Sequence, residues 1–232
     1  MVKNVIKNMM IATSAFIFVA CGSSGDSYTP VDSDDNDAPK STLTQDLKDA
    51  ITYMYNEEGL AHDVYLNIYK IQPVNQLQNI AVNSETKHIE AVNEMAIKYD
   101  LNMTTYDPTI EPYSREGIGD GNYSVHHIQV LYDALYPKGI KSKQDALEVG
   151  CMVEVVDIVD LEAYITLAKE SNAEDVLEVF DFLIRGSYTH YWAFDDGLMK
   201  LKNSNDPNDG CCSVLDEFGL GLDFCHPEYP QK

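Results

Sequence analysis

The chain has 232 residues, of which 44% are hydrophobic, and its 38 acidic residues outnumber its 16 lysines and arginines to give a formal net charge of −22. A surface this negative repels the phosphates of nucleic acids, so the composition excludes a nucleic-acid-binding protein. The same charge attracts metal cations and keeps a secreted domain soluble.

The first 20 residues have the pattern of a signal peptide. Two lysines precede an apolar run from Met9 to Ala20, which is shorter than the roughly 20 residues that a membrane-spanning helix needs. The small residue before Cys21 is typical of lipoprotein cleavage, but Phe18 stands where such sites usually have Leu, so ordinary secretion is the alternative. We predict a lipoprotein signal peptide over 1–20, lipidation of Cys21 and a lipid-anchored protein of the cell envelope. In a Gram-negative cell this would be the outer membrane or the periplasmic face.

The rest of the chain divides by composition into three parts. Residues 21–41 are rich in Ser, Asp, Gly and Pro and have almost no large apolar side chain, which predicts a flexible tether. For residues 42–202 we predict one helical domain. Residues 203–232 predict a C-terminal tail that contains cysteines.

Apolar side chains recur every three to four residues in four long segments, which is the period of a helix and not of a strand. The Val-rich stretch 153–159 would also suit a strand, but acids at every third position and the length of its segment favour a helix. A loop over 100–124 and a shorter helix over about 125–136, which stops before Pro137, connect the second and third segments. The prediction is therefore an all-α fold, a four-helix bundle with a long crossover between its second and third helices. The four segments are 43–71, 75–99, 142–170 and 173–202.

Four cysteines follow Cys21. Outside the cytoplasm, Cys225 is expected to form a disulfide with either Cys211 or Cys212. A metal site made by Cys225 and its neighbour His226 is the less favoured alternative. Cys151 is expected to be a small buried residue.

Ionisable side chains interrupt the apolar stripes of all four long segments. This is informative because such groups almost never enter a core unless they are paired or bind a metal ion. Bundle folds hold two irons or manganeses with one Glu from each of two helices and a Glu-x-x-His motif from each of the other two. Carboxylate and imidazole ligands suit these ions, so the sequence predicts a metal centre. The interrupting residues are Glu58, Glu85, His88, Glu154 and His190.

Two segments, EGLAHDVY at 58–65 and SETKH at 84–88, resemble the first half-site of ferritin-like diiron proteins, the rubrerythrins especially. A third segment, RGSYTHYWAF at 185–194, resembles a bacterial ferritin-like domain family whose biochemical role is not established. The resemblance covers roughly residues 43–200. It implies a ferritin-like bundle in which Glu58 and His88 are terminal ligands of one metal ion, Glu85 is a bridge, and Glu154 and His190 bind the second ion.

One position departs from that resemblance. The family has a bridging Glu three residues before the histidine of the last helix, where this chain has Ser187. Asp157, one turn after Glu154, resembles an additional carboxylate of rubrerythrins and would restore four carboxylates and two imidazoles. A site that holds a single metal ion is the alternative.

Each candidate ligand also has a structural alternative. Glu58 could belong to a solvated acidic pair with Glu57, Glu154 could form a buried ion pair with Arg185, His190 could be a core histidine, and Asp157 could be solvated. Tyr65 could gate electron transfer, although core packing explains it more simply. Three further histidines are expected to be exposed: His62, His126 and His127.

Three functions follow from these patterns. The first is a non-haem diiron oxidoreductase that reduces peroxide or dioxygen with iron, or manganese, as its metal. It would need an external electron donor, because the chain has no Cys-x-x-Cys pairs that would hold a rubredoxin-type iron. The second is a lipoprotein that binds iron or another divalent metal without turnover. The third is a metal-free structural bundle, and the oligomeric state is left open.

Overall fold

The computed structural model describes residues 40–102, 121–123 and 125–231. The predicted signal peptide, Cys21, nearly all of the tether and most of the predicted loop lie outside the described residues. Within the described ranges every regular element is a helix, so the prediction of an all-α fold is confirmed.

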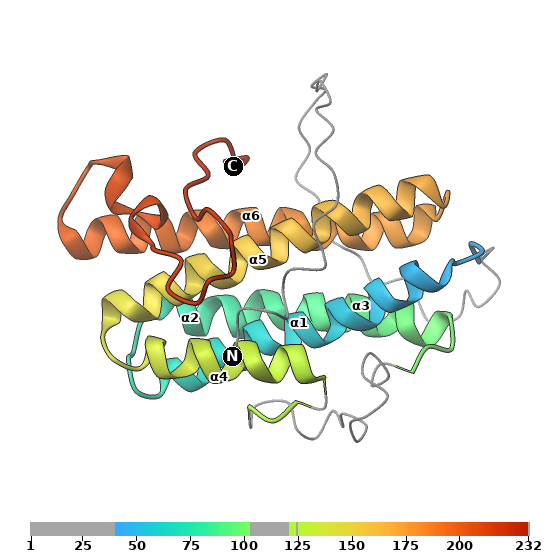
Figure 1. Cartoon of the computed structure of the whole chain (residues 1–232), viewed down its shortest axis with the longest axis horizontal. Helices are drawn as coiled ribbons and strands as arrows, with labels where there is room; N and C mark the ends of the chain where they lie inside the picture. Colours follow the sequence, from blue (N-terminus) through green and yellow to red (C-terminus); the bar gives the residue numbers. More distant parts are fainter. Residues whose placement is uncertain (1–39, 103–120, 124, 232) are drawn as a thin grey trace.

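The described helices follow the predicted segments closely. Figure 1 shows them as a set of long rods that run roughly along one axis of the molecule. Short helical turns follow in the C-terminal tail, at Pro207–Asp209 and Cys211–Ser213. The longer elements are α1 (Gln45–Tyr69), α2 (Asn75–Ile80), a π-helical turn (Ala81–Glu85), α3 (Thr86–Lys98), α4 (His126–Gly139), α5 (Lys143–Glu170) and α6 (Glu174–Lys202).

Two helices, α1 and α5, each follow a residue whose side chain caps the first turn. Thr44 accepts a hydrogen bond from the backbone N–H of Leu47 at the start of α1, and Ser142 accepts one from that of Asp145 at the start of α5. Each cap satisfies an N–H that has no partner inside its helix, which stabilises the helix by about 1 kcal/mol. The sequence had predicted the helix that begins after Ser142.

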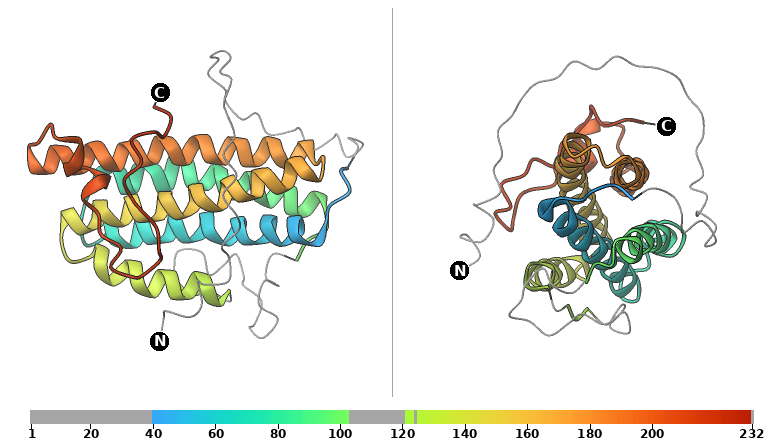
Figure 2. Two further views of the ribbon diagram at one scale, coloured as in Figure 1. Left: turned by 45° about the horizontal axis from the view of Figure 1, so that its top comes forward. Right: turned by 90° about the vertical axis from the view of Figure 1, so that its right-hand side faces the viewer.

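The helices pack as neighbouring pairs. α5 and α6 lie side by side along their lengths, and α1 packs against α3, α4 and α5 (Figures 1 and 2). α3 in turn contacts α6, so four helical elements surround one interior. Large side chains such as Tyr65, Phe180 and Phe194 are fully buried there, and their burial removes apolar surface from water.

Two helix boundaries differ from the predictions. The segment predicted as one helix over 75–99 is divided by the π-helical turn Ala81–Glu85, in which one extra residue is accommodated between α2 and α3. The prediction that the short helix stops before Pro137 is wrong, because α4 continues through it to Gly139. Proline lacks a backbone N–H and so removes one hydrogen bond of the helix, but Pro137 lies in the last turn, where this loss disturbs the helix least. In the same turn the ammonium of Lys138 forms an ion pair with Glu148 at 2.7 Å.

One disulfide joins the C-terminal tail to α5, and a second lies within the tail. Cys212 pairs with Cys225, which confirms the expected tail disulfide, so Cys225 is not a metal ligand. Cys151 is buried, as expected, but the sequence did not predict that it pairs with Cys211. The pairing was missed because Cys151 lies on the apolar face of a long helix, far from the other cysteines in sequence.

None of the helices within the described ranges is both long and apolar enough to cross a membrane.

Candidate metal centre

Five of the six predicted metal ligands lie together in the interior between α1, α3, α5 and α6. They come from α1, the π-helical turn, α3, α5 and α6, and each is buried. Their exposed fractions are 2% for Glu58, 1% for Glu85, 1% for His88, 2% for Glu154 and 5% for His190.

These residues form two groups of three, and in each group the ligand atoms all lie within 4.8 Å of one another. The first group is Glu58, Glu85 and His88. The second is Glu85, Glu154 and His190. Each group offers two carboxylates and one imidazole, a set that suits iron, manganese or zinc, so the arrangement could hold a metal ion in each group.

Glu85 belongs to both groups and connects the two histidines. Its Oε2 atom lies 3.0 Å from Nδ1 of His88, and its Oε1 atom lies 3.0 Å from Nδ1 of His190. The imidazole rings are stacked with their centroids 5.5 Å apart. The carboxylate therefore presents one oxygen to each half of the site.

Both histidines direct the same ring nitrogen, Nδ1, toward two carboxylates. Nδ1 of His88 lies 3.0 Å from Glu58 as well as 3.0 Å from Glu85, and Nδ1 of His190 lies 3.4 Å from Glu154. One N–H can donate a good hydrogen bond to one acceptor, so the second carboxylate at each imidazole needs another positive partner. A metal ion at these positions would bind both.

Unsatisfied oxygens support the same conclusion. Oε1 of Glu58 and Oδ1 of Asp157 are buried, and neither has a hydrogen-bond partner among the described residues. Glu85 Oε1 and His190 Nδ1 approach each other, but they too have no properly oriented hydrogen bond within that part of the chain. Because a buried polar atom without a partner costs free energy, the residues present fit a bound cation.

Neighbouring side chains hold the two imidazoles in place. Ser84 Oγ lies 2.7 Å from Nε2 of His190, the ring nitrogen that faces away from the carboxylates. Phe182 packs edge-on against the ring of His88 at 5.3 Å. A Cβ atom added at Gly186 would lie 2.3 Å from Nε2 of His88, so only glycine leaves room for this ring. Such outer contacts fix the orientation of a ligating imidazole.

Two hydrogen bonds orient the carboxylates of α5. The hydroxyl of Tyr65 donates to Oε1 of Glu154 at 2.5 Å, and the hydroxyl of Ser187 donates to Oδ2 of Asp157 at 2.5 Å. Asp157 is thus near the centre but belongs to neither ligand group. The serine that replaces the expected glutamate of α6 binds the carboxylate that was predicted to compensate for it.

The site has a strong excess of negative charge. Burial raises the pKa of Glu58 well above its usual range, and the nearby charges of Asp157 and Glu85 raise it further. Burial and the charge of Glu154 raise the pKa of Asp157 to about 8. Burial alone would also raise the pKa of Glu85, but its ion pairs with His190 and His88 lower it below the usual range. A metal cation would offset this repulsion.

Comparison with known proteins places the chain in a family. The family model described as "Uncharacterized protein domain (DUF2202)" matches residues 47–208. The chain belongs to the DUF2202 family. All five residues of the two ligand groups lie inside the matched range.

Two comparisons lead to the same archaeal relative of this DUF2202 protein. The chain is 35% identical over 156 residues to "Uncharacterized protein MJ0754" of Methanocaldococcus jannaschii, which covers 67% of this chain and 77% of the relative. It is also similar to the solved structure titled "Crystal structure of hypothetical protein MJ0754 from Methanococcus jannaschii DSM 2661". The TM-score is 0.63 at 31% identity, with 80% of this chain and 98% of that one covered.

Other residues of the DUF2202 protein that the sequence singled out lie away from the ligand groups. Arg185 is exposed, and it forms no ion pair with Glu154, whose carboxylate contacts Tyr65 and His190. His126 and His127 are exposed as expected, whereas His62 is half-buried and lies 2.9 Å from Asp63. Glu57 is buried and is not part of a solvated pair with Glu58.

The sequence did not reveal the supporting residues of this DUF2202 site. Tyr65 was explained by core packing, yet its hydroxyl binds Glu154. Ser84 and Gly186 were not selected, because a serine or a glycine in a helix carries no signal of its own. The available signal was their position in the sequence: Ser84 directly precedes Glu85, and Gly186 directly precedes Ser187.

Without metal, the stability of the DUF2202 protein is expected to fall as pH rises from 5 to 9. The pKa of Asp157 is about 8 against a usual 3.8, so its contribution to stability is complete below 3.8 and is lost as pH rises through 8. Burial alone would lower the pKa of His190, but the charges of Glu85 and Glu154 raise it from 6.5 to about 10. The contribution of His190 to stability is therefore complete below pH 6.5 and is lost as pH rises toward 10. Scanning calorimetry with a chelator should show the melting temperature falling by about 10 °C.

Asp157→Asn is the control for this pH dependence. It keeps the shape of the side chain but cannot ionise, so the fall in melting temperature between pH 5 and 9 should become smaller. Added metal should reduce the fall in the wild type as well. A melting temperature that is constant or rises over this range in metal-free wild type would contradict the assignment.

Proposed function

We propose that this protein is a non-haem diiron oxidoreductase that reduces peroxide or dioxygen, with manganese as the alternative metal. One ion would be held by Glu58, Glu85 and His88, and the other by Glu85, Glu154 and His190. The observation that carries the proposal is the shared position of Glu85, whose two oxygens face the two histidines at 3.0 Å each. A carboxylate placed in this way is suited to bridge two ions.

The fold that we propose for this function is the ferritin-like four-helix bundle, with the long connection between α3 and α5 as its crossover. Support comes from the five ligands, which are contributed by the helical elements that surround one interior. The proposed location is the cell envelope, with Cys21 as the lipid-bearing residue that attaches the protein to a membrane. An external protein would supply electrons.

When bound, two ferrous ions would supply the two electrons that cleave the O–O bond of peroxide. The residues of the chain have separate tasks. Glu58 and Glu154 would each offset the positive charge of the ion in their own ligand group, and the hydroxyl of Tyr65 fixes Glu154 through its 2.5 Å hydrogen bond. Burial and the charge of Glu154 raise the pKa of Tyr65 well above its usual range, so the phenol keeps its proton there. The burial of all the ligands excludes bulk water.

The test is peroxide consumption by protein loaded with ferrous ion in the absence of oxygen. The reaction H₂O₂ + 2 Fe²⁺ + 2 H⁺ → 2 Fe³⁺ + 2 H₂O predicts consumption of about one peroxide for every two irons, much faster than by the same concentration of free ferrous ion. Consumption no faster than that of free ferrous ion would contradict an oxidoreductase.

A second candidate is metal binding without turnover. It is favoured by Ser187, which lies where a second bridging carboxylate is expected and instead donates its hydroxyl to Asp157. Stoichiometric metal binding combined with no acceleration of peroxide loss would identify this function. Absence of metal binding would leave the third alternative, a structural bundle.

A further inference from the structure

The two disulfides meet at adjacent cysteines of the C-terminal tail. Cys211 pairs with Cys151 of α5, and both are fully buried. Cys212 pairs with Cys225, and both are partly exposed. A disulfide exchanges with an external thiol only where that thiol can reach a sulfur atom, so an external thiol reaches the second disulfide more readily than the first. The tail therefore holds an accessible disulfide next to a shielded one.

Tyr191 of α6 contacts both disulfide regions. Its backbone oxygen lies 3.7 Å from Sγ of Cys211. Its hydroxyl donates a hydrogen bond to the backbone oxygen of Phe224 and accepts one from the backbone N–H of His226, both at 3.0 Å. These two residues are the neighbours of Cys225 in the chain. One tyrosine therefore positions Cys225 relative to Cys211.

The backbone distance between Cys211 and Cys225 is short enough for exchange. The Cα atoms of Cys212 and Cys225 are 3.9 Å apart. Consecutive Cα atoms are about 3.8 Å apart, so those of Cys211 and Cys225 are at most about 8 Å apart. A disulfide spans up to about 7 Å between Cα atoms, so a small movement of the tail allows a bond between these two residues.

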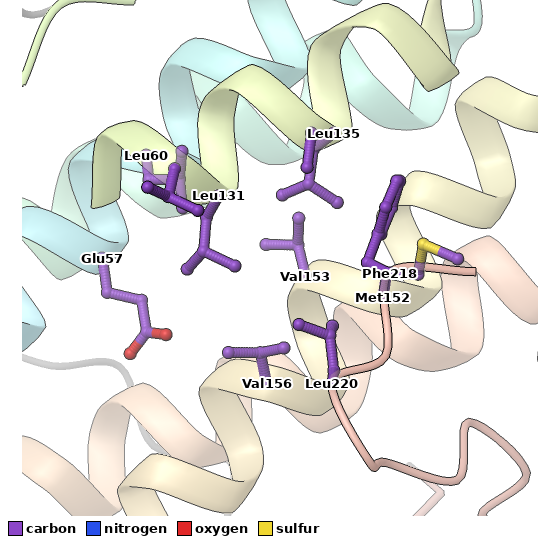
Figure 3. Close-up of a pocket in the computed structure, with 11 residues that line it drawn as sticks. Glu57, Leu60, Leu131, Leu135, Met152, Val153, Val156, Phe218 and Leu220 are labelled. Atoms are coloured by element: carbon purple, nitrogen blue, oxygen red, sulfur yellow. The ribbon is translucent and has the colours of Figure 1, made fainter. Parts of the chain in front are cut away.

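Apolar side chains hold the loop between Cys212 and Cys225 against the helices. Phe218 and Leu220 of this loop line a small apolar pocket together with side chains of α4 and α5 (Figure 3). Phe224 is 1% exposed. Because these contacts do not involve sulfur, we expect the loop to keep its place when its disulfide is reduced. The freed thiols would then stay at a high effective concentration near the buried disulfide.

Acidic side chains beside the accessible disulfide indicate the charge of a thiol that would react with it. The residues between Cys212 and Cys225 include three acids and no lysine or arginine. All three acids are exposed: Asp216, Glu217 and Asp223. Opposite charges speed an encounter and like charges slow it, so the surface favours a donor that is positively charged near its thiols.

We propose that the two disulfides form a relay that takes two electrons from a positively charged dithiol and stores them as the thiols of Cys151 and Cys211. The dithiol first reduces Cys212–Cys225 to two thiols and is itself oxidised to a disulfide. The thiolate of Cys225 then attacks Sγ of Cys211, which forms a Cys211–Cys225 disulfide and releases Cys151. The thiolate of Cys212 attacks Sγ of Cys225, which restores Cys212–Cys225 and releases Cys211. In total, two electrons and two protons pass from the dithiol to the buried pair.

The buried pair lies beside the candidate metal centre. Cys151 precedes Glu154 by three residues in α5, and residues at this spacing are neighbours on one face of a helix, with Cβ atoms about 5–6 Å apart. Two electrons are the number that reduces one peroxide. Only this use of the electrons rests on the proposed function. The exchange itself needs no metal ion, so metal-free protein tests it independently of peroxide reduction.

The test follows each cysteine in the whole metal-free protein, with Cys21→Ser so that no fifth thiol takes part. Protein treated with excess dithiothreitol without oxygen is sampled over time, alkylated and analysed by peptide mass spectrometry. Alkylation is expected first at Cys212 and Cys225 and later at Cys151 and Cys211. With Cys212 and Cys225 both replaced by Ser, reduction of the buried pair should be at least about tenfold slower. An equal rate in the two proteins would overturn the relay.

A single variant isolates the exchange within the chain. Cys212→Ser leaves Cys225 with a free thiol and removes the thiol that completes the last exchange. Peptide mapping without a reductant should therefore find the Cys211–Cys225 disulfide, with Cys151 as a free thiol. Cys225→Ser is the matched control and should keep the Cys151–Cys211 disulfide, with Cys212 free. If Cys212→Ser keeps Cys151–Cys211 and Cys225 is its one free thiol, the internal attack does not occur.

A matched series of small thiols tests the charge of the donor. Cysteamine is positive, 2-mercaptoethanol is neutral and mercaptoacetate is negative, and the rate of each with Cys212–Cys225 is divided by its rate with an uncharged model disulfide. At low ionic strength this normalised rate should be at least about threefold higher for cysteamine than for mercaptoacetate, and added salt should reduce the difference. Equal normalised rates for the three thiols would overturn the positive charge of the donor.

Discussion

Replacement of Glu85 by Gln is expected to abolish metal binding in both ligand groups. Because Glu85 is the one residue that the two groups share, its loss leaves Glu58 with His88 on one side and Glu154 with His190 on the other. Loss of a group that merely supports a ligand reduces metal affinity by about 10- to 100-fold, so loss of a shared ligand should cost at least about 100-fold. Metal analysis of protein equilibrated with ferrous ion or manganese measures the result.

Two comparisons make this prediction specific. Glu90→Gln changes an exposed acid on the same helical segment and should retain full metal content. His190→Ala removes a ligand from the second group alone and should leave about half of the metal. Equal metal content in Glu85→Gln and Glu90→Gln would disprove the candidate centre, provided that circular dichroism shows both to be folded.

Removal of the disulfide between Cys151 and Cys211 is expected to have the largest effect on stability. The two cysteines are separated by 60 residues, and in the chain-entropy description a loop of that length stabilises the fold by about 4 kcal/mol. Both side chains are also 0% exposed, so their loss disturbs the packing between α5 and the tail. Urea unfolding of a protein with both residues replaced by Ala should show the loss.

The second disulfide provides the internal comparison. Cys212 and Cys225 are separated by 13 residues, which predicts a stabilisation of about 3 kcal/mol, and both are partly exposed. Replacing this pair by Ala should therefore cost less than replacing the first. A larger loss from the Cys212–Cys225 pair would show that the tail, and not the long loop that contains α6, dominates the stability.

The sequence predicted the helices well because their apolar side chains recur with a strong period. Residues such as Leu47 and Leu198, which set that period, are fully buried. The interrupting acids and histidines were informative for the same reason, since a charged residue on an apolar face has few explanations. Glu58, Glu85, His88, Glu154 and His190 accordingly lie together, although their role as ligands stays a prediction.

What the sequence did not predict depends on contacts between distant segments. The pairing of Cys151 with Cys211 requires that the tail fold back over α5, which no local pattern encodes. The hydrogen bond from Ser187 to Asp157 likewise joins α6 to α5. The end of α4 was misplaced because a proline in a last turn costs less than a proline in the middle of a helix.

The π-helical turn Ala81–Glu85 affects how relatives of this protein should be aligned. It ends at Glu85, the first residue of the motif that also carries His88, and it adds one residue relative to a regular helix. A relative without the turn would have one residue fewer between α2 and the motif while keeping the same three-dimensional positions for both. An alignment that forbids gaps inside helices would then shift either the core residues of α2 or the ligands by one position. Searches for this site in distant sequences should therefore allow a single-residue gap between 81 and 85.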